Sequence, residues 1–176
     1  DRLDSWAEDG VISPTEKQGI KDEIARIKAD KDNISAGYEL YNLGEATAYN
    51  TAYTDYYNSL LVLSDTTKET IEIPTDFATK QTKYYTERTA ALNAIASASK
   101  SAVDAAQAAA DAAKSRLDSW AADGVISPAE KQSIKDERAR ILADKADITT
   151  GYTRYNLGTP TDYNTAYTAY DTALAA

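Results

Sequence analysis

The sequence contains two copies of one long segment, and this repeat constrains the possible fold more than any other feature. Residues 2–60 align without a gap with residues 116–174, at an offset of 114 positions, and 41 of the 59 aligned residues are identical. Internal repetition of this length is typical of arrays in which each unit contacts its neighbours. We therefore expect a first unit at residues 1–115 and a truncated second unit at residues 116–176, within a longer parent protein.

Each copy has the same helix-start signal, followed by an amphipathic pattern. In the first copy Ser13 can accept from first-turn amides, Pro14 suits the first helical position, and Glu16 can reach back to complete a capping box. The apolar residues that follow are spaced three, four and seven apart, which predicts a helix with a buried stripe: Ile20, Ile24, Ile27, Ile34, Tyr38 and Tyr41. We expect the charged residues to fill its solvated face: Lys21, Asp22, Lys28 and Asp30. The helix should end near Asn42, with Gly44 in the left-handed capping position.

Two more helices are expected in a complete unit. The second begins near Thr47 and has its own apolar stripe: Tyr49, Ala52, Tyr53, Tyr56 and Leu60. The segment 66–74 interrupts the helical pattern. Residues 70–73 alternate like a short strand, but because no partner strand is evident we expect an extended loop. The third helix opens at Phe77, and neither proline nor glycine interrupts the chain from there to Asp123.

The pattern as a whole predicts an all-α fold of tandem three-helix bundles joined by a long shared helix, with the second repeat truncated. Residues 96–113 of that helix consist almost entirely of Ala, Ser, Asp, Lys and Gln. Alanine favours a helix intrinsically, so this span can stand as a solitary connector. Small side chains also let helices approach closely, so the alternative is a seam against another chain, which would make the protein a homo-oligomer.

Composition argues against several classes of function. The 176 residues include no Cys and no His, which removes thiolate metal sites, the commonest general base and the commonest transition-metal ligand. The net charge of −9 would repel a nucleic-acid phosphate backbone on average. No apolar run approaches the roughly 20 residues that span a bilayer. We therefore expect a non-enzymatic protein with no cofactor, no nucleic-acid partner and no membrane insertion.

A short motif before the first helix resembles the calcium loop of an EF-hand. Gly10 falls on the invariant glycine and Glu16 on the bidentate ligand, but Ser5 and Ala7 occupy positions that require carboxylates. Because calcium needs six to eight oxygen ligands, we expect a metal-free corner in which Gly10 makes the turn and Ile12 fills the core. Both copies contain the corner residues: Asp9, Gly10, Ile12, Ser13 and Glu16, then Asp123, Gly124, Ile126, Ser127 and Glu130.

Tyrosine and tryptophan supply the candidate binding residues. Most of the 13 tyrosines follow helical spacing, which favours core packing over a surface that stacks on sugars. Tyr57 and Tyr85 lie off the main stripe and are the better candidates for glycan contact. Trp6 and Trp120 precede the glycine turns, where they are candidates either for a partner interface or for a cap over the joint between units.

The corner and the helix after it resemble a helical repeat of bacteriophage and prophage tail proteins. Those repeats have segments of the form D-G-x-I-S-P-x-E-K, followed by an amphipathic helix. The matching residues are Trp6, the run 9–14, Glu16, Lys17, Ile24 and Ile27. The run 85–88, with Leu92 and Ile95 after it, is similar to the third helix of the same family.

This resemblance implies a structural segment of a virion tail, and the family supplies no catalytic residues. We therefore expect a spacer or stalk whose partners are other domains or subunits of the same fibre. The alternative is a bacterial adhesin or glycan-binding module, placed extracellularly or at the cell surface. A glycan array and a scattering profile would separate these two classes.

Overall fold

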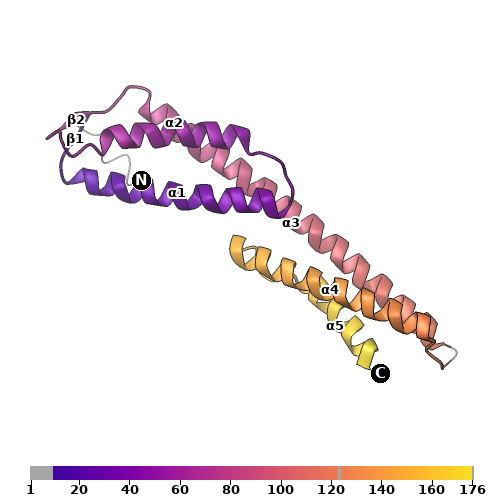
Figure 1. Cartoon of the computed structure of the whole chain (residues 1–176). Helices are drawn as coiled ribbons and strands as arrows, with labels where there is room; N and C mark the ends of the chain where they lie inside the picture. The colour runs from indigo at the N-terminus through magenta and orange to yellow at the C-terminus, as the bar shows by residue number, and fades with distance from the viewer. Residues whose placement is uncertain (1–9, 123, 176) are drawn as a thin grey trace. The chain divides into compact units, whose positions relative to one another are not determined.

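The computed structural model describes residues 10–122 and 124–175 and confirms the all-α fold (Figure 1). The chain divides into two compact units, Asp1–Ile95 and Ala96–Ala176, whereas the sequence repeats divide after Ser115. The elements in order are β1 (Val11–Ile12), α1 (Glu16–Leu40), α2 (Thr47–Leu63), β2 (Ile71–Glu72), α3 (Phe77–Ala121), α4 (Pro128–Tyr155) and α5 (Thr161–Ala175). The predicted starts of α2 and α3 are confirmed, and α3 is unbroken over 45 residues.

The first unit packs α1 and α2 side by side against the first part of α3. Its fully buried side chains are isoleucine, leucine and tyrosine, in agreement with the predicted stripes on α1 and α2: Ile20, Ile27, Ile34, Tyr49, Tyr56, Leu60, Leu63, Tyr84 and Ile95. Tyrosine suits this thin core because its ring is apolar while its hydroxyl can reach a polar partner at the edge. Burial of these side chains holds the three helical segments together.

The second unit also consists of three helical segments, α4 and α5 packed with the last part of α3. Val103 and Ala106 of α3 form one apolar cluster with Ile148 of α4 and Tyr163 of α5. A second cluster contains Ala113, Leu117, Ile141 and Tyr170, with Trp120 packed against it. The third helix of this unit is therefore the alanine-rich segment of α3, in which small side chains take the place of aromatic ones. The prediction that this segment stands as a solitary connector is wrong, because it packs against α4 and α5.

The prediction of an extended loop at residues 70–73 is wrong. Ile71–Glu72 form the short strand β2, which pairs antiparallel with β1, so that Val11 lies opposite Glu72 and Ile12 opposite Ile71. The partner strand lies inside the corner motif, for which the sequence predicted only a turn at Gly10 and a core position for Ile12. Ile12 is nonetheless buried, at 1% exposure, as predicted. In the second copy Val125 is exposed and forms no strand.

The predicted capping box occurs in full only in the second copy. There the Ser127 side chain accepts from the amide of Glu130, the Glu130 carboxylate accepts from the amide of Ser127, and α4 begins at Pro128. In the first copy α1 begins two residues later, at Glu16, and the Ser13 hydroxyl donates to the Glu16 carboxylate instead of accepting from an amide. Only the Glu16 half of the predicted box is made.

Asparagine, not glycine, is the first left-handed residue after each of these helices. Asn42 has φ 50° and Asn156 has φ 51°, so the prediction that Gly44 holds the helix C-terminal cap is wrong. Gly44 also has a positive φ, 76°, but it lies two residues further along, in the connection to α2. Asparagine tolerates this conformation better than other non-glycine residues.

Two acidic residues of α1 contradict the prediction that its charged residues face solvent. Glu23 lies within the buried stripe, whereas Ile24, predicted for that stripe, is only partly buried. The side chain of Asp30 is 18% exposed and pairs with α3. Both carboxylates face the third helix of the first unit, and they define the candidate site.

Candidate functional site

The most concentrated polar chemistry in the described residues lies between α1 and α3 of the first unit. Its carboxylates are Glu23 and Asp30 of α1, and the groups around them are Arg26, Tyr56, Tyr84, Tyr85 and Arg88. We call this set the polar cluster. It contains two carboxylates and two guanidinium groups, so its formal charges cancel.

Arg88 of α3 forms a bidentate ion pair with Asp30 of α1. Its Nε donates to Asp30 Oδ2 over 2.7 Å, and its Nη2 donates to Asp30 Oδ1 over 3.0 Å. The Tyr84 hydroxyl also donates to Asp30 Oδ2, over 3.1 Å. A two-point guanidinium–carboxylate pair fixes orientation as well as distance. This pair therefore sets the register of α3 against α1.

Glu23 gathers donors from all three helical segments of the unit. Its Oε1 accepts from the Tyr85 hydroxyl over 2.9 Å and from the Tyr56 hydroxyl over 3.3 Å. Arg26, one turn along α1, donates to both Glu23 oxygens and also contacts the Tyr85 hydroxyl. Because a buried carboxylate is costly unless it is satisfied, these donors explain how Glu23 is tolerated in the core stripe.

Aromatic rings surround the polar cluster. The Tyr84 ring lies between Tyr49 and Tyr56, with centroid separations of 5.9 Å and 5.3 Å. Tyr56 also contacts Phe77, at 5.7 Å, and Tyr85 packs edge-on against Tyr84 at 5.2 Å. Offset and edge-on aromatic pairs stabilise a core beyond the area they bury.

Burial shifts the acid–base behaviour of these tyrosines. Desolvation raises the pKa of Tyr85 to about 12, and its hydrogen bond to Glu23 acts in the same direction. Desolvation also raises the pKa of Tyr49 to about 12 and that of Tyr84 well above its ordinary value. The three hydroxyls therefore stay protonated at neutral pH, and those of Tyr84 and Tyr85 donate to the carboxylates of Asp30 and Glu23. Nothing in the geometry tunes them toward proton transfer near pH 7.

The equivalent place in the second unit has the same acids but fewer donors. Glu137 and Asp144 correspond to Glu23 and Asp30 at the 114-residue offset. Glu137 pairs with Arg116 of α3, yet its Oε2 atom is buried without a hydrogen-bond partner among the described residues. The buried hydroxyl of Tyr170, which corresponds to Tyr56, also lacks one there.

The third helix runs in opposite directions along the two helix pairs. In the first unit successive α3 residues Tyr85 and Arg88 meet Glu23 and then Asp30, so this part of α3 is parallel to α1. In the second unit Val103 shares an apolar cluster with Ile148, and Leu117, further along α3, shares one with Ile141, earlier in α4. That part of α3 is therefore antiparallel to α4. The same apolar face of the pair accepts a helix in either direction.

The predicted binding residues are distributed across both units. Tyr85 belongs to the polar cluster, a role that its off-stripe position had not revealed. Tyr57 is partly buried and stacks on Tyr53, with centroids 5.5 Å apart and planes 13° apart. Trp120 packs on the apolar cluster of the second unit. Trp6 lies outside the described residues.

The corner motif is described only in part, because Asp9 and Asp123 lie outside the described residues. Gly10 and Gly124 have φ of 75° and 73°, which agrees with their predicted role in the turn. No group of three or more acidic side chains that could hold a metal ion occurs in residues 10–122 and 124–175. Over the same residues, no helix combines the length and the apolarity needed to cross a membrane.

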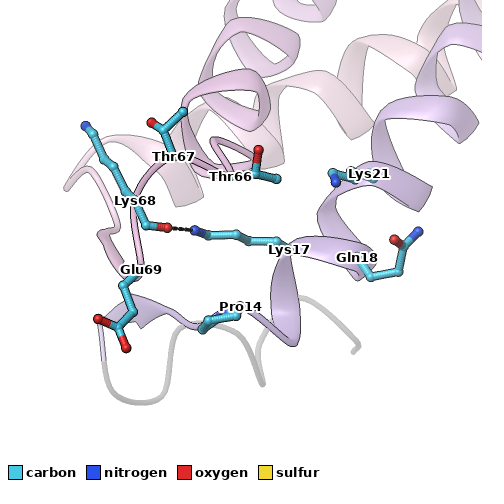
Figure 2. Close-up of a pocket in the computed structure, with 8 residues that line it drawn as sticks. All are labelled: Pro14, Lys17, Gln18, Lys21, Thr66, Thr67, Lys68 and Glu69. Carbon is cyan, nitrogen blue, oxygen red and sulfur yellow. Dashed lines mark hydrogen bonds between the residues drawn. The ribbon is translucent and has the colours of Figure 1, made fainter.

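A shallow hollow lies where α1 begins, against the loop after α2, with a volume of about 420 Å³ (Figure 2). Lys17, which is only 5% exposed, points across it, and its ammonium donates to the backbone carbonyl of Lys68. Lys21 and Glu69 also line the hollow. Lys17 thus ties the start of α1 to the loop that leads into β2.

Comparison with known proteins adds one finding. A family described as a GA-like domain matches residues 95–151, which cover the last part of α3 and most of α4. Comparison with curated proteins and with solved structures gave no match. The matched span is less than half of the chain, and within it the similarity is to a helical domain.

Proposed function

We propose that the chain is a non-enzymatic spacer of a phage-tail-like fibre, in which repeated helical units set the separation of other domains. The observation that supports this most is the continuity of α3. One unbroken 45-residue helix gives buried residues to both compact units, Tyr84 and Ile95 to the first and Ala110 and Leu117 to the second. A helix of this length extends roughly 68 Å at 1.5 Å per residue.

The polar cluster supports the same role. Each of its carboxylates accepts hydrogen bonds from several donors, some of them on neighbouring helices, and such a network stabilises the packing of the helices. The corner motif D-G-x-I-S-P-x-E-K, present in both copies as residues 9–17 and 123–131, is what connects this spacer to tail proteins. The fibre and its virion are therefore proposed on the basis of resemblance, and the spacer on the basis of α3.

Small-angle X-ray scattering tests the spacer role. A compact sphere-like domain of 176 residues has a radius of gyration of about 16 Å. A spacer built on α3 should give a clearly larger radius and a longest dimension of at least roughly 68 Å. A radius near 16 Å would contradict the proposal. Tail genes beside the parent gene would support the fibre, and their absence would count against it.

One observation favours a glycan-binding alternative. Tyr53 and Tyr57 stack nearly parallel and are both only partly buried, so they offer the kind of aromatic face on which sugars stack. The second copy retains Tyr167 but has Asp171 in place of Tyr57. A glycan array decides between the two functions. Specific binding that disappears in Tyr57→Ala would favour the adhesin, and no specific binding would favour the spacer.

A further inference from the structure

We propose that the apolar face of the α4–α5 pair is a binding surface for a second copy of the helix at residues 77–95. In this chain the alanine-rich segment 103–117 of α3 occupies that face. The proposal is that segment 103–117 and a helix of the 77–95 sequence compete for this one surface. Either helix can then serve as the third helix of the bundle. It stands independently of the spacer role.

The two helix pairs present the same surface. Five buried apolar residues of the first pair recur in the second at the 114-residue offset, and all are buried in both units: Ile27 and Ile141, Ile34 and Ile148, Tyr49 and Tyr163, Ala52 and Ala166, Tyr56 and Tyr170. The acids beside them are also conserved between the copies, with Glu137 for Glu23 and Asp144 for Asp30. A helix that fits the first face therefore meets the same side chains on the second.

The first unit shows how a helix of the 77–95 sequence binds this face. Tyr84 inserts its ring against Tyr49 and Tyr56, Tyr85 donates to Glu23, and Arg88 grips Asp30 with two hydrogen bonds. The contacts combine aromatic packing with two charge-assisted anchors. Such anchors specify direction and register as well as strength.

The helix that occupies the second face leaves two buried side-chain atoms without hydrogen-bond partners among the described residues, whereas the first unit leaves one, the Tyr49 hydroxyl. The Glu137 side chain is only 9% exposed, and its Oε2 atom has no hydrogen-bond partner in the described residues. Within the same residues the Tyr170 hydroxyl is also unsatisfied, and the Asp144 carboxylate has neither an ion-pair partner nor a hydrogen-bond partner. An unsatisfied buried polar atom is destabilising. A 77–95 helix brings donors for both acids, Tyr85 for Glu137 and Arg88 for Asp144.

The resident segment also fills the face with smaller side chains. It contributes Val103, Leu117 and three alanines (Ala106, Ala110 and Ala113), where the 77–95 helix contributes Phe77, Tyr84, Ala91 and Ile95. Larger apolar side chains bury more surface and gain more free energy. The resident segment has the advantage of being tethered, which corresponds to a millimolar effective concentration for a short linker. A substitution that weakens the packing of the resident segment should therefore make binding of a 77–95 helix easier to detect.

A peptide tests the proposal on the full chain. The probe is a fluorescein-labelled synthetic peptide of residues 75–97, with blocked ends, titrated with the 176-residue protein and followed by fluorescence anisotropy. We expect saturable binding that tightens about tenfold or more when Val103→Asp weakens the resident segment. Hydrogen exchange should then accelerate in segment 103–117 on addition of the peptide, because that segment is displaced.

Matched variants locate the binding face. In the Val103→Asp chain, Asp144→Asn should weaken peptide binding about fivefold or more, whereas Asp30→Asn, at the same position of the first pair, should not. A peptide with Arg88→Met should lose the same interaction. Anisotropy that saturates equally for all these combinations would overturn the proposal, because the binding would then not use the acid–arginine contact.

Loss of folding is controlled separately. If circular dichroism shows that Val103→Asp unfolds the second unit, the milder Ala106→Gly chain takes its place. Absence of saturable binding to a folded, weakened chain would overturn the proposal. A scattering profile of the unmodified chain is unaffected by this result, so failure here and failure of the spacer role are distinguishable.

Discussion

Arg88 and Asp30 form a two-point ion pair between α3 and α1, with Nε 2.7 Å from Oδ2 and Nη2 3.0 Å from Oδ1. The two residues are 58 positions apart in sequence, so the pair joins the last helical segment of the first unit to its first helix. The side chains are 29% and 18% exposed, which places the pair at the edge of the core, where solvent screens it only partly.

Removal of Arg88 should destabilise the first unit. We expect Arg88→Met to lower the free energy of unfolding by about 1–3 kcal/mol, because Asp30 would keep its desolvation cost and lose its main partner. Urea denaturation followed by circular dichroism measures the change. Lys100→Met is the control, since its ion pair with Asp104 is exposed and should contribute less than about 1 kcal/mol. Equal effects of the two substitutions would refute this account of the pair.

The two equivalent glutamates should differ in their importance. Glu23→Gln removes a carboxylate that accepts from Arg26, Tyr56 and Tyr85, whereas Glu137→Gln removes one whose side-chain partner among the described residues is Arg116. We expect the first substitution to cost about 1–2 kcal/mol more than the second. Thermal or urea unfolding of the two variants decides the comparison, and a larger loss for Glu137→Gln would reverse it.

Alkaline pH should unfold the protein through its tyrosines. Burial raises the pKa of Tyr49, Tyr85 and Tyr163 to about 12, above the ordinary value of 10. Above pH 10 the unfolded chain loses these protons first, so the free energy of unfolding should be constant up to about pH 10 and fall from there to about pH 12. Urea midpoints measured from pH 8 to 12 test this. A stability that rises in that window would contradict the pKa shifts.

The left-handed residues after α1 and α4 should discriminate between alanine and glycine. At Asn42, with φ 50°, substitution by Ala should cost about 1 kcal/mol because Ala keeps the Cβ that strains this conformation and loses the polar side chain that lets Asn tolerate it. Substitution by Gly should be neutral or slightly stabilising. The same pair of substitutions at Asn156 is the internal replicate. If Ala proves as stable as Gly at both positions, these residues do not have the positive φ.

The helices could be predicted from sequence because their signals are local. The spacing of isoleucines and tyrosines gave the stripes, and the uninterrupted run after Phe77 gave α3, including its passage beyond the first unit. The β1–β2 pairing could not be predicted, since Val11 and Ile71 are far apart in sequence and neither segment alone is long enough to indicate a strand.

The polar cluster was missed for a different physical reason. Glu23 and Asp30 have the charge of a solvated face, and no local rule shows that Tyr85 and Arg88, about 60 positions later, will satisfy them. One signal was available: Glu23 sits between Ile20 and Ile27 at stripe spacing, and both copies retain it as Glu137. The left-handed residue after α1 was predicted at Gly44, two positions beyond its actual place at Asn42, because the sequence pattern does not fix the end of a helix that closely.

Continuity of α3 is the claim on which the account most depends, and a distance between two spin labels tests it directly. The chain has no cysteine, so Thr89→Cys and Ser115→Cys, both exposed on α3, would place labels uniquely, one in each compact unit. An unbroken helix predicts a single narrow distribution centred near 39 Å, from 26 residues at about 1.5 Å each. A broad distribution, or one centred well below that distance, would show that α3 is broken between the units and would contradict the account.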